Sequence, residues 1–210
     1  AADGAKIVAP RLLHSTQWGL LCPIHSPDGG NVGLHKHLST STHITSGISI
    51  KKYVDYLKSL KYNNDFVGIK LLEECPIQFL SNTTKVMING FWIGNTVSPI
   101  KMCNLMRLHK RNNIIDTFTS IYFNIRLNEI NFFTDGGRPI RPLFYMYKDE
   151  MSYERANILK LYDNDELSWN NLINGFGNNL TDYSSSKKVE TLEKDASILE
   201  YIDTQEAEGI

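Results

Sequence analysis

Apolar residues recur at helical spacing in the stretch that follows Ser49. The spacing of three and four residues predicts an amphipathic helix over residues 49–60, with Ser49 capping its first turn. The apolar stripe of this helix consists of Ile50, Tyr53, Val54 and Leu57. The polar run Asn63-Asn64-Asp65 is expected to end it.

A second helix is predicted over residues 99–111. Ser98 before Pro99 is the favoured order for the N-cap and the first helical position, and Lys110 and Arg111 would stabilise the carboxyl end. The buried side of this helix is expected to carry Ile100, Cys103 and Met106.

Strand patterns fill much of the middle of the chain. Residues 85–88 and 91–94 flank Asn89-Gly90 and predict a β-hairpin, because this pair accepts the positive φ angles of a type I′ turn. Shorter apolar runs predict strands over residues 66–72, 77–80 and 121–125. In the last of these, the inward residues are expected to be Ile121, Phe123 and Ile125.

The segment 138–145 is expected to be extended, after a turn over residues 134–137. Pro139 and Pro142 forbid a helix there and disfavour a central position in a sheet, since proline has no backbone N–H to donate.

Residues 18–24 form an apolar run that predicts a buried strand, and a loop rich in glycine follows directly. Pro27 and Asp28 favour a tight turn there. Free amides on Gly29 and Gly30 can form a small anion-binding concavity. A rigid scaffold that continues into such a loop is typical of a binding site.

The composition of the chain excludes an intrinsically disordered protein. With 41% hydrophobic and 21% charged residues, the chain of 210 residues is globular in composition. Its net charge of -1 gives no general attraction to nucleic acid, so any such contact must be local. Between Lys6 and Lys61 the only acids are Asp28 and Asp55, whereas residues 190–208 carry most of their charge as acid. We expect that acidic end to be a solvated face.

The chain shows no secretory signal and no apolar run of the ~20 residues that a membrane span needs, so no membrane partner is expected. Three widely spaced cysteines favour a reduced, intracellular compartment. The opening Ala-Ala-Asp-Gly indicates an excerpt from a longer protein.

A zinc site is an alternative interpretation of the same region. The available ligands are Cys22, His25, His35, His37 and His43. A structural zinc takes four ligands of this type, but the spacing matches no common finger. For Cys22 itself, burial in the apolar run is expected to raise the pKa of the thiol and keep it inert.

The amino-terminal segment closely resembles the fork region of the second-largest (beta-type) subunit of multisubunit DNA-directed RNA polymerases, whose pattern is R-x-L-H-x-T-x-W-G, C-P, T-P-E-G and G-L-x-K-x-L. The matching residues are Arg11, Leu13, His14, Thr16, Trp18, Gly19, Cys22, Pro23, Ser26, Pro27, Asp28, Gly29, Gly33, Leu34, Lys36 and Leu38. The blocks KVMINGFWIG and NEINFFTDGGRPIRPLF, and later SW and LEYID, are similar to further segments of that family.

This resemblance implies an α+β fragment with mixed short strands, hairpins and helices in two or three small lobes. The implied segments are a fork-like active-centre segment (1–46), a first external-type lobe (47–142) and a second external-type lobe with the acidic end (143–210). The implied activity is template-dependent RNA synthesis by a nucleotidyltransferase, in a nucleus, a virion or a cytoplasmic viral factory. The implied partners are the largest and smaller polymerase subunits, DNA template, RNA transcript and nucleoside triphosphates. Mg²⁺ would be held mainly by the largest subunit, and this segment would be inactive alone.

The resemblance also implies roles for individual residues, none of them catalytic or metal-binding. Those expected to contact nucleic acid or the active centre are Arg11, Pro27, Asp28, Gly29, Gly30, Asn31 and Lys36. Those expected to be structural or to form interfaces are His14, Trp18, Gly33, Asn89, Gly90, Trp92, Asp135, Arg138 and Arg141. Asp28 is one methylene shorter than the family's usual Glu, and His25 replaces an acid. The alternatives are a zinc-binding interaction module and a nucleic-acid-binding domain outside any polymerase.

Overall fold

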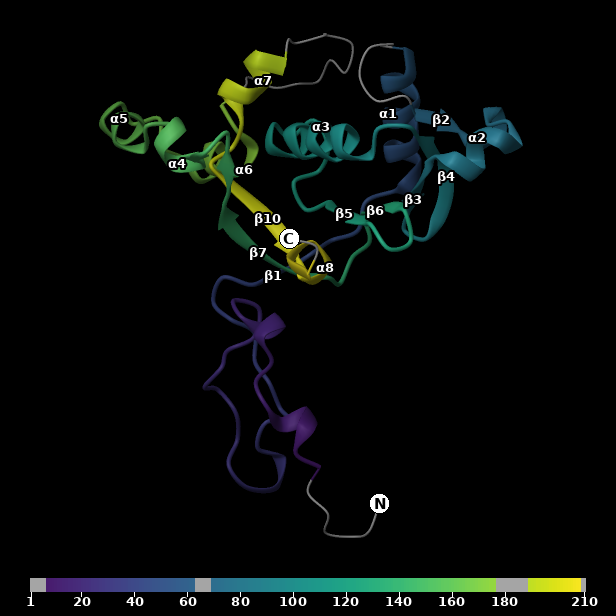
Figure 1. The fold of residues 1–210 in the computed structure, drawn as a ribbon. Coiled ribbons are helices and arrows are strands. Elements are labelled where there is room, and N and C mark those ends of the chain that lie inside the picture. Colours follow the sequence, from purple (N-terminus) through teal and green to yellow (C-terminus); the bar gives the residue numbers. More distant parts are fainter. Residues whose placement is uncertain (1–6, 63–68, 177–188, 209–210) are drawn as a thin grey trace.

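The computed structural model describes residues 7–62, 69–176 and 189–208, which form a body of sheets and helices and a projecting amino-terminal arm (Figure 1). The main sheet has five strands in the order β2-β4-β3-β6-β5. These strands are β2 (Ile69–Leu71), β3 (Thr84–Ile88), β4 (Phe91–Thr96), β5 (Ser120–Asn124) and β6 (Glu129–Phe133). Neighbouring strands are antiparallel except β3 and β6, which are parallel.

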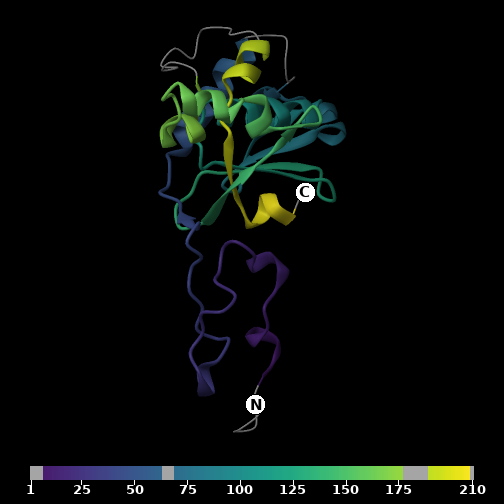
Figure 2. The same ribbon diagram turned by 90° about the vertical axis from the view of Figure 1, so that its left-hand side faces the viewer.

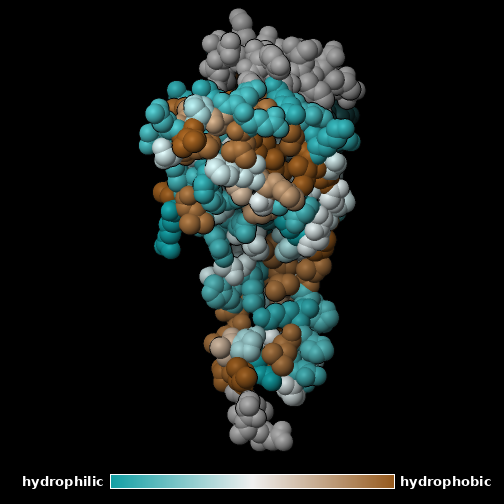
Figure 3. All heavy atoms as spheres, turned by 90° about the vertical axis from the view of Figure 1, so that its right-hand side faces the viewer, coloured by the Kyte–Doolittle hydropathy of each residue, from teal (hydrophilic) through white to brown (hydrophobic). Residues whose placement is uncertain are grey.

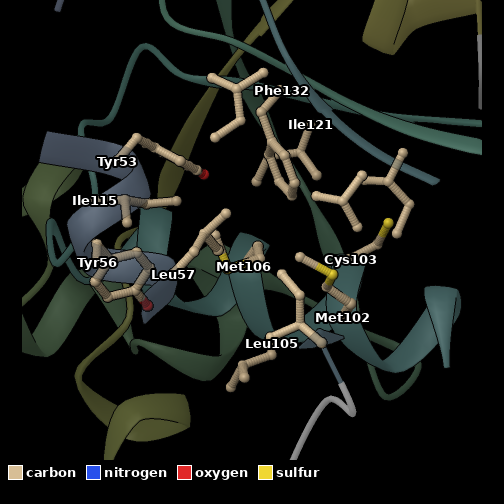
Figure 4. Packing of buried hydrophobic residues seen from close by; sticks show 14 residues of the cluster. Tyr53, Tyr56, Leu57, Met102, Cys103, Leu105, Met106, Ile115, Ile121 and Phe132 are labelled. Atoms are coloured by element: carbon tan, nitrogen blue, oxygen red, sulfur yellow. The ribbon is translucent and has the colours of Figure 1, made fainter. Parts of the chain in front are cut away.

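Two helices cover one face of this sheet and enclose the main core. They are α1 (Ile50–Tyr62) and α3 (Pro99–Arg111). Figure 4 shows side chains of α1 and α3 pointing toward Ile121 and Phe132 of the sheet. The predicted stripe of α1 is confirmed, since Tyr53 and Leu57 are buried and Ile50 and Val54 pack against the cluster.

The predicted bounds of α3 are confirmed, but its predicted inward face is partly wrong. Ile100 is 66% exposed, because it lies beside the outer strand β5 and not over the sheet. Ser98 is the N-cap residue, yet its side chain caps no amide. The residues that α3 buries are Met102, Cys103, Leu105, Met106, Leu108, His109 and Lys110.

The hairpin of β3 and β4 is confirmed. Asn89 and Gly90 have φ angles of 48° and 82°, the left-handed values that a type I′ turn requires. The side chain of Asn89 also accepts a hydrogen bond from the Thr134 amide at 2.8 Å. The turn is therefore held to β6 as well as to its own strands.

Two of the shorter strand predictions need correction. Residues 77–80 belong to the helix α2 (Ile77–Asn82), which begins after Pro76 and leaves Ile77 85% exposed. Ile125 is 79% exposed, because β5 ends at Asn124 and the turn to β6 begins there. Of the predicted strand 66–72, β2 covers Ile69–Leu71, and residues 66–68 lie outside the described part.

A second, three-stranded sheet has the order β1-β7-β10. Its strands are β1 (His43–Ile44), β7 (Pro139–Phe144) and β10 (Leu199–Asp203). The expectation that β7 avoids a central position is wrong. β1 pairs only with Pro139 and Ile140, so no strand lies beside Pro142 on that side of β7. The N–H that Pro142 lacks is therefore not needed by a neighbouring strand there.

The remaining elements flank this second sheet. They are β8 (Met146–Tyr147), β9 (Glu150–Met151), α4 (Ser152–Arg155), α5 (Ile158–Asp163), α6 (Trp169–Asn174), α7 (Val189–Asp195) and α8 (Thr204–Glu208). A small core joins Ile140 of β7, Ile173 of α6 and Tyr201 of β10. The expected boundary between the two external-type lobes, after residue 142, falls inside β7. Both segments therefore contribute to the same sheet. Within the described ranges, no helix is long and apolar enough to cross a bilayer.

The expected solvated face at the acidic end is wrong for three of its acids. Glu200, Asp203 and Glu206 are 6%, 4% and 4% exposed. Each of these acids forms an ion pair with a buried or half-buried cation. Glu206 pairs with Lys110 and Glu200 with Arg111, both at the end of α3, and Asp203 pairs with Arg138. These ion pairs join the carboxyl-terminal strand to the middle of the chain.

The arm comprises residues 7–42, which precede β1, and it extends well away from the body (Figures 1 and 2). The predicted buried strand over residues 18–24 is wrong. Trp18 and Ile24 are 69% and 89% exposed, and Leu20 is the one residue of that run that is fully buried. An apolar run is buried only where a second layer covers it; α8 contacts the base of the arm at Ser15–Gln17, but Trp18 and Ile24 stay exposed. The α+β class is confirmed.

Candidate functional site

The arm carries a tight loop, residues 26–33, that we call the arm loop. The hydroxyl of Ser26 accepts a hydrogen bond from the Gly33 amide at 2.8 Å and donates one to the carbonyl of His35 at 3.3 Å. A short 3-10 helix, Gly29–Asn31, forms the tip of the loop. Ser26 therefore closes the loop at its base.

Arg11 holds the arm loop from the side. Its Nη1 donates to the carbonyls of Gly30 and Val32, both at 2.8 Å, and its Nε donates to the carbonyl of Ile7 at 3.2 Å. These contacts give Arg11 a positioning role on the loop backbone, in addition to the nucleic-acid contact expected of it.

Gly33 is required by the close approach of two backbones. Its φ is +73°, and a Cβ built there would lie 2.4 Å from the carbonyl oxygen of Arg11. Gly29 also has a positive φ, whereas Gly30 does not, and neither has an atom within 4 Å of a built Cβ. The base of the loop is thus packed and its tip is open.

The tip of the arm loop presents both acceptors and donors. The Asp28 side chain is exposed and makes no cap hydrogen bond to the 3-10 helix. The amides of Gly29 and Gly30 have no acceptor among the residues with described positions, whereas the 3-10 helix turns the Asn31 amide toward the Asp28 carbonyl. Pro27, Asn31 and Lys36 are exposed as well. A carboxylate accepts from hydroxyl or amino groups, while free amides and a lysine donate to anions.

The cysteine and histidines of the arm do not converge on a metal site. His25 and His37 stack with ring centroids 3.7 Å apart, and the Cys22 amide donates to the carbonyl of His37. Over the described ranges, no three His, Cys, Asp or Glu side chains are grouped to hold a metal ion. The expected rise in the pKa of the Cys22 thiol is wrong: hydrogen bonds from the amides of Ile24 and His25 lower this pKa, because the sulfur is not buried.

The remaining predicted arm residues lie near its base. His14 Nδ1 accepts from the Thr16 amide at 3.3 Å and so caps a short 3-10 helix, Ser15–Gln17. Trp18 faces outward. The side chain of Arg141 in β7 lies against Gly19, where a built Cβ would be 2.6 Å from Nη1 of Arg141.

Arg138 anchors the arm to the body. Its Nη1 lies 3.0 Å from Oδ2 of Asp203, its Nε lies 2.9 Å from Oδ1 of Asp135, and its Nη2 donates to two backbone carbonyls. Its amide donates to the hydroxyl of Thr45, the residue that follows β1. In the neighbouring sheet, the Trp92 indole donates to the side chain of Asn95 at 2.8 Å.

Ser26 and the buried acids of the carboxyl-terminal segment are positioning residues that were not predicted. Ser26 was noted only as part of a motif, although Ser before Pro-Asp-Gly is a common turn signal. The buried acids were missed because their charge suggested exposure. The apolar neighbours Tyr201 and Ile202 were the one local sign that this segment enters a sheet.

Comparisons with known proteins place these features in a family. Two family profiles match: RNA polymerase Rpb2, domain 3, over residues 2–44, and RNA polymerase Rpb2, domain 4, over residues 86–147. The first covers the arm and the second covers the hairpin, α3 and β5 to β8.

Several curated relatives match over most of the chain. The DNA-directed RNA polymerase II subunit RPB2 of Encephalitozoon cuniculi is 35% identical over 80% of the chain, and that of Meyerozyma guilliermondii is 34% identical over 99%. The DNA-directed RNA polymerase subunit 2 of Acanthamoeba polyphaga mimivirus is 28% identical over the whole chain. The chain spans 14%, 16% and 15% of the length of these three relatives.

Proposed function

This chain belongs to the family of second-largest subunits of DNA-directed RNA polymerases, and we propose that it works as part of such an enzyme in template-directed RNA synthesis. Within that enzyme, the arm loop would position the RNA 3′ end or the incoming nucleotide. The lobes of the body would dock other subunits. The segment would not catalyse the reaction by itself.

The observation that carries this proposal is the construction of the arm loop. Ser26 and Gly33 hold its base and Arg11 holds its side, while Asp28 and the unpaired amides of Gly29 and Gly30 lie at its exposed tip. A loop that is held at its base and open at its tip can position a reactive group. Because the loop geometry is already fixed, little conformational entropy has to be lost when the substrate binds. Asp28 would accept from a ribose hydroxyl or a base amino group, and Lys36 would contact phosphate.

Magnesium would be supplied to this site by another subunit. Asp28 is the single acid of the arm, and a Mg²⁺ site needs several oxygen ligands. When bound, the ion would activate the attacking oxygen and neutralise charge on the phosphates. The residues of this chain would orient the substrate beside it.

Exposed apolar surface supports docking to other subunits. Trp18, Ile24 and Leu13 of the arm are each more than half exposed. On the body, apolar side chains gather on the face that carries α2 and the hairpin of β3 and β4 (Figure 3), where Ile77 and Phe91 are 85% and 63% exposed. Surfaces of this kind mark protein contacts. The partners would be the largest and smaller polymerase subunits, DNA, RNA and nucleoside triphosphates, in a nucleus or a viral factory.

Substitution of Asp28 in the assembled polymerase tests this function. Asp28→Ala should slow single-nucleotide addition more than it weakens promoter binding, and Asp28→Glu should retain more activity because it keeps the carboxylate. Asp55→Ala is the matched control, since Asp55 is the other acid of this region and lies exposed on α1. Addition kinetics of Asp28→Ala equal to those of the control would refute the role of the arm loop.

A further inference from the structure

The outer edge of β5 is open beyond its first residues. β5 is the last strand of the five-stranded sheet, and the Ile121 amide on its outer side donates to Oε1 of Glu206 at 2.8 Å. In an antiparallel ladder, the N–H and C=O of one residue point to the same edge of the strand, and those of the residue two positions later point to that edge again. The N–H and C=O of Phe123 therefore point outward as well, two residues beyond the one amide that Glu206 satisfies.

A groove runs along this edge between α3 and β5. Its volume is about 180 Å³, and its walls include Ile100 and Arg107 of α3 and Phe123 and Ile125 at the end of β5. Ile100 and Ile125 are 66% and 79% exposed. Single exposed apolar residues are ordinary on protein surfaces, but these two flank unpaired backbone groups.

Arg107 is the cation among the residues that line the groove. Its side chain makes no hydrogen bond or ion pair within the described ranges, although its charge helps to lower the pKa of Glu200. Arg126, which follows Ile125, is exposed and is likewise unpaired within the described ranges. Glu206 is the acid that lines the groove, and it is already engaged by Lys110 and the Ile121 amide.

We propose that this edge accepts an extended segment of another protein, in which the residues that face the groove, every second one, are apolar at one end and acidic at the other. The segment would pair with the backbone of Phe123, as in recognition by β-strand addition. Side chains on one face of a strand repeat every second residue, so the apolar and the acidic residue must lie on the same face of the segment. An apolar residue would contact Ile100 and Ile125, and a later residue of that face would lie near Arg107. An acidic side chain would reach Arg107 and pair with it in the bidentate geometry that guanidinium favours.

The probe for this site is a short capped peptide, Ser-Val-Ser-Glu-Ser, in which valine and glutamate lie on the same face of the strand, added to the whole 210-residue chain. Amide hydrogen exchange followed by NMR should show protection of the Phe123 amide when the peptide binds. Arg107→Glu should weaken binding by about tenfold or more, because it replaces attraction with like-charge repulsion. Lys101→Glu is the matched control, since Lys101 is exposed on α3 but does not line the groove.

Three results would overturn this inference. They are an unprotected Phe123 amide at saturating peptide, equal binding of a valine–lysine peptide, and an unchanged affinity for Arg107→Glu. If circular dichroism shows that Arg107→Glu does not fold, Ile100→Glu tests the same groove from an exposed position. Failure here leaves the role of the arm loop untouched, because the groove and the arm loop are tested on different residues.

Discussion

The ammonium nitrogen of Lys110 lies 3.2 Å from Oε2 of Glu206, 96 residues later in the chain, and both side chains are buried. Lys110 also donates to the carbonyl of Tyr201 at 2.7 Å. Burial raises the pKa of Glu206 to about 7, against the opposing effect of Lys110. For Glu200, burial alone would raise the pKa, but Arg111 and Lys110 hold it below its usual value. The end of α3 thus anchors the carboxyl-terminal strand and helix.

Removing the cation should therefore be costly. Lys110→Met keeps the length of the side chain but leaves two buried carboxylates with one cation fewer. We expect a loss of about 3–5 kcal/mol in the free energy of unfolding, measured by urea denaturation, as for other broken buried ion pairs. Lys101→Met, on an exposed turn of α3, should change it by less than about 0.5 kcal/mol. A loss below about 1 kcal/mol for Lys110→Met would show that the network does not hold these elements together.

Alanine substitutions at two glycines of the arm loop should have different effects on its stability. Gly33→Ala places a Cβ against the backbone of Arg11 at a φ of +73°, whereas Gly30→Ala meets open space. The left-handed conformation alone costs an alanine about 1–2 kcal/mol, so the amide of residue 33 should exchange about tenfold faster in Gly33→Ala. NMR-detected hydrogen exchange measures this rate. Equal rates in the two variants would mean that the contact with Arg11 does not shape the loop.

Two cysteines should react at different rates. Amide hydrogen bonds from Ile24 and His25 lower the pKa of the Cys22 thiol, while burial raises the pKa of Cys103 to about 11. Because the thiolate is the nucleophile, iodoacetamide at neutral pH should modify Cys22 well before Cys103. Peptide mapping by mass spectrometry follows both sites in one sample. Faster labelling of Cys103 would contradict the exposure of the arm.

Stability should depend on pH through His109, which is buried and hydrogen-bonded to the Tyr56 hydroxyl. Burial lowers the pKa of His109 to about 4, below its usual 6.5, so the unfolded chain binds this proton first. The stabilisation is complete above about pH 6.5 and is lost as pH falls towards 4, by up to about 3 kcal/mol.

The matched variant for this measurement is His109→Gln, which can still accept from Tyr56 but does not titrate. Glu206 has the opposite dependence, since its raised pKa adds stability as pH falls below about 7, and it is present in both proteins. The difference in unfolding free energy between wild type and His109→Gln should therefore shrink from pH 6.5 to 4. A constant difference over this range would contradict a neutral, buried His109.

Features set by neighbouring residues could be predicted from the sequence. Asn89-Gly90 adopts the predicted left-handed turn, and Pro99 begins α3 at the predicted position. The motif of residues 11–39 is by itself sufficient to indicate the polymerase family. Such features depend on backbone preferences of a few adjacent residues, and these preferences are present wherever the segment lies.

Burial and partners were decided only by the tertiary structure. Trp18 and Ile24 are exposed although they belong to an apolar run, while Lys110 and Glu206 are buried because α3, β10 and α8 meet there. Arg11 contacts the arm loop across 19 residues of sequence, a distance over which local patterns carry no information. Local sequence determines which conformations a segment prefers, but the free energy of burying a side chain depends on which distant segments pack beside it.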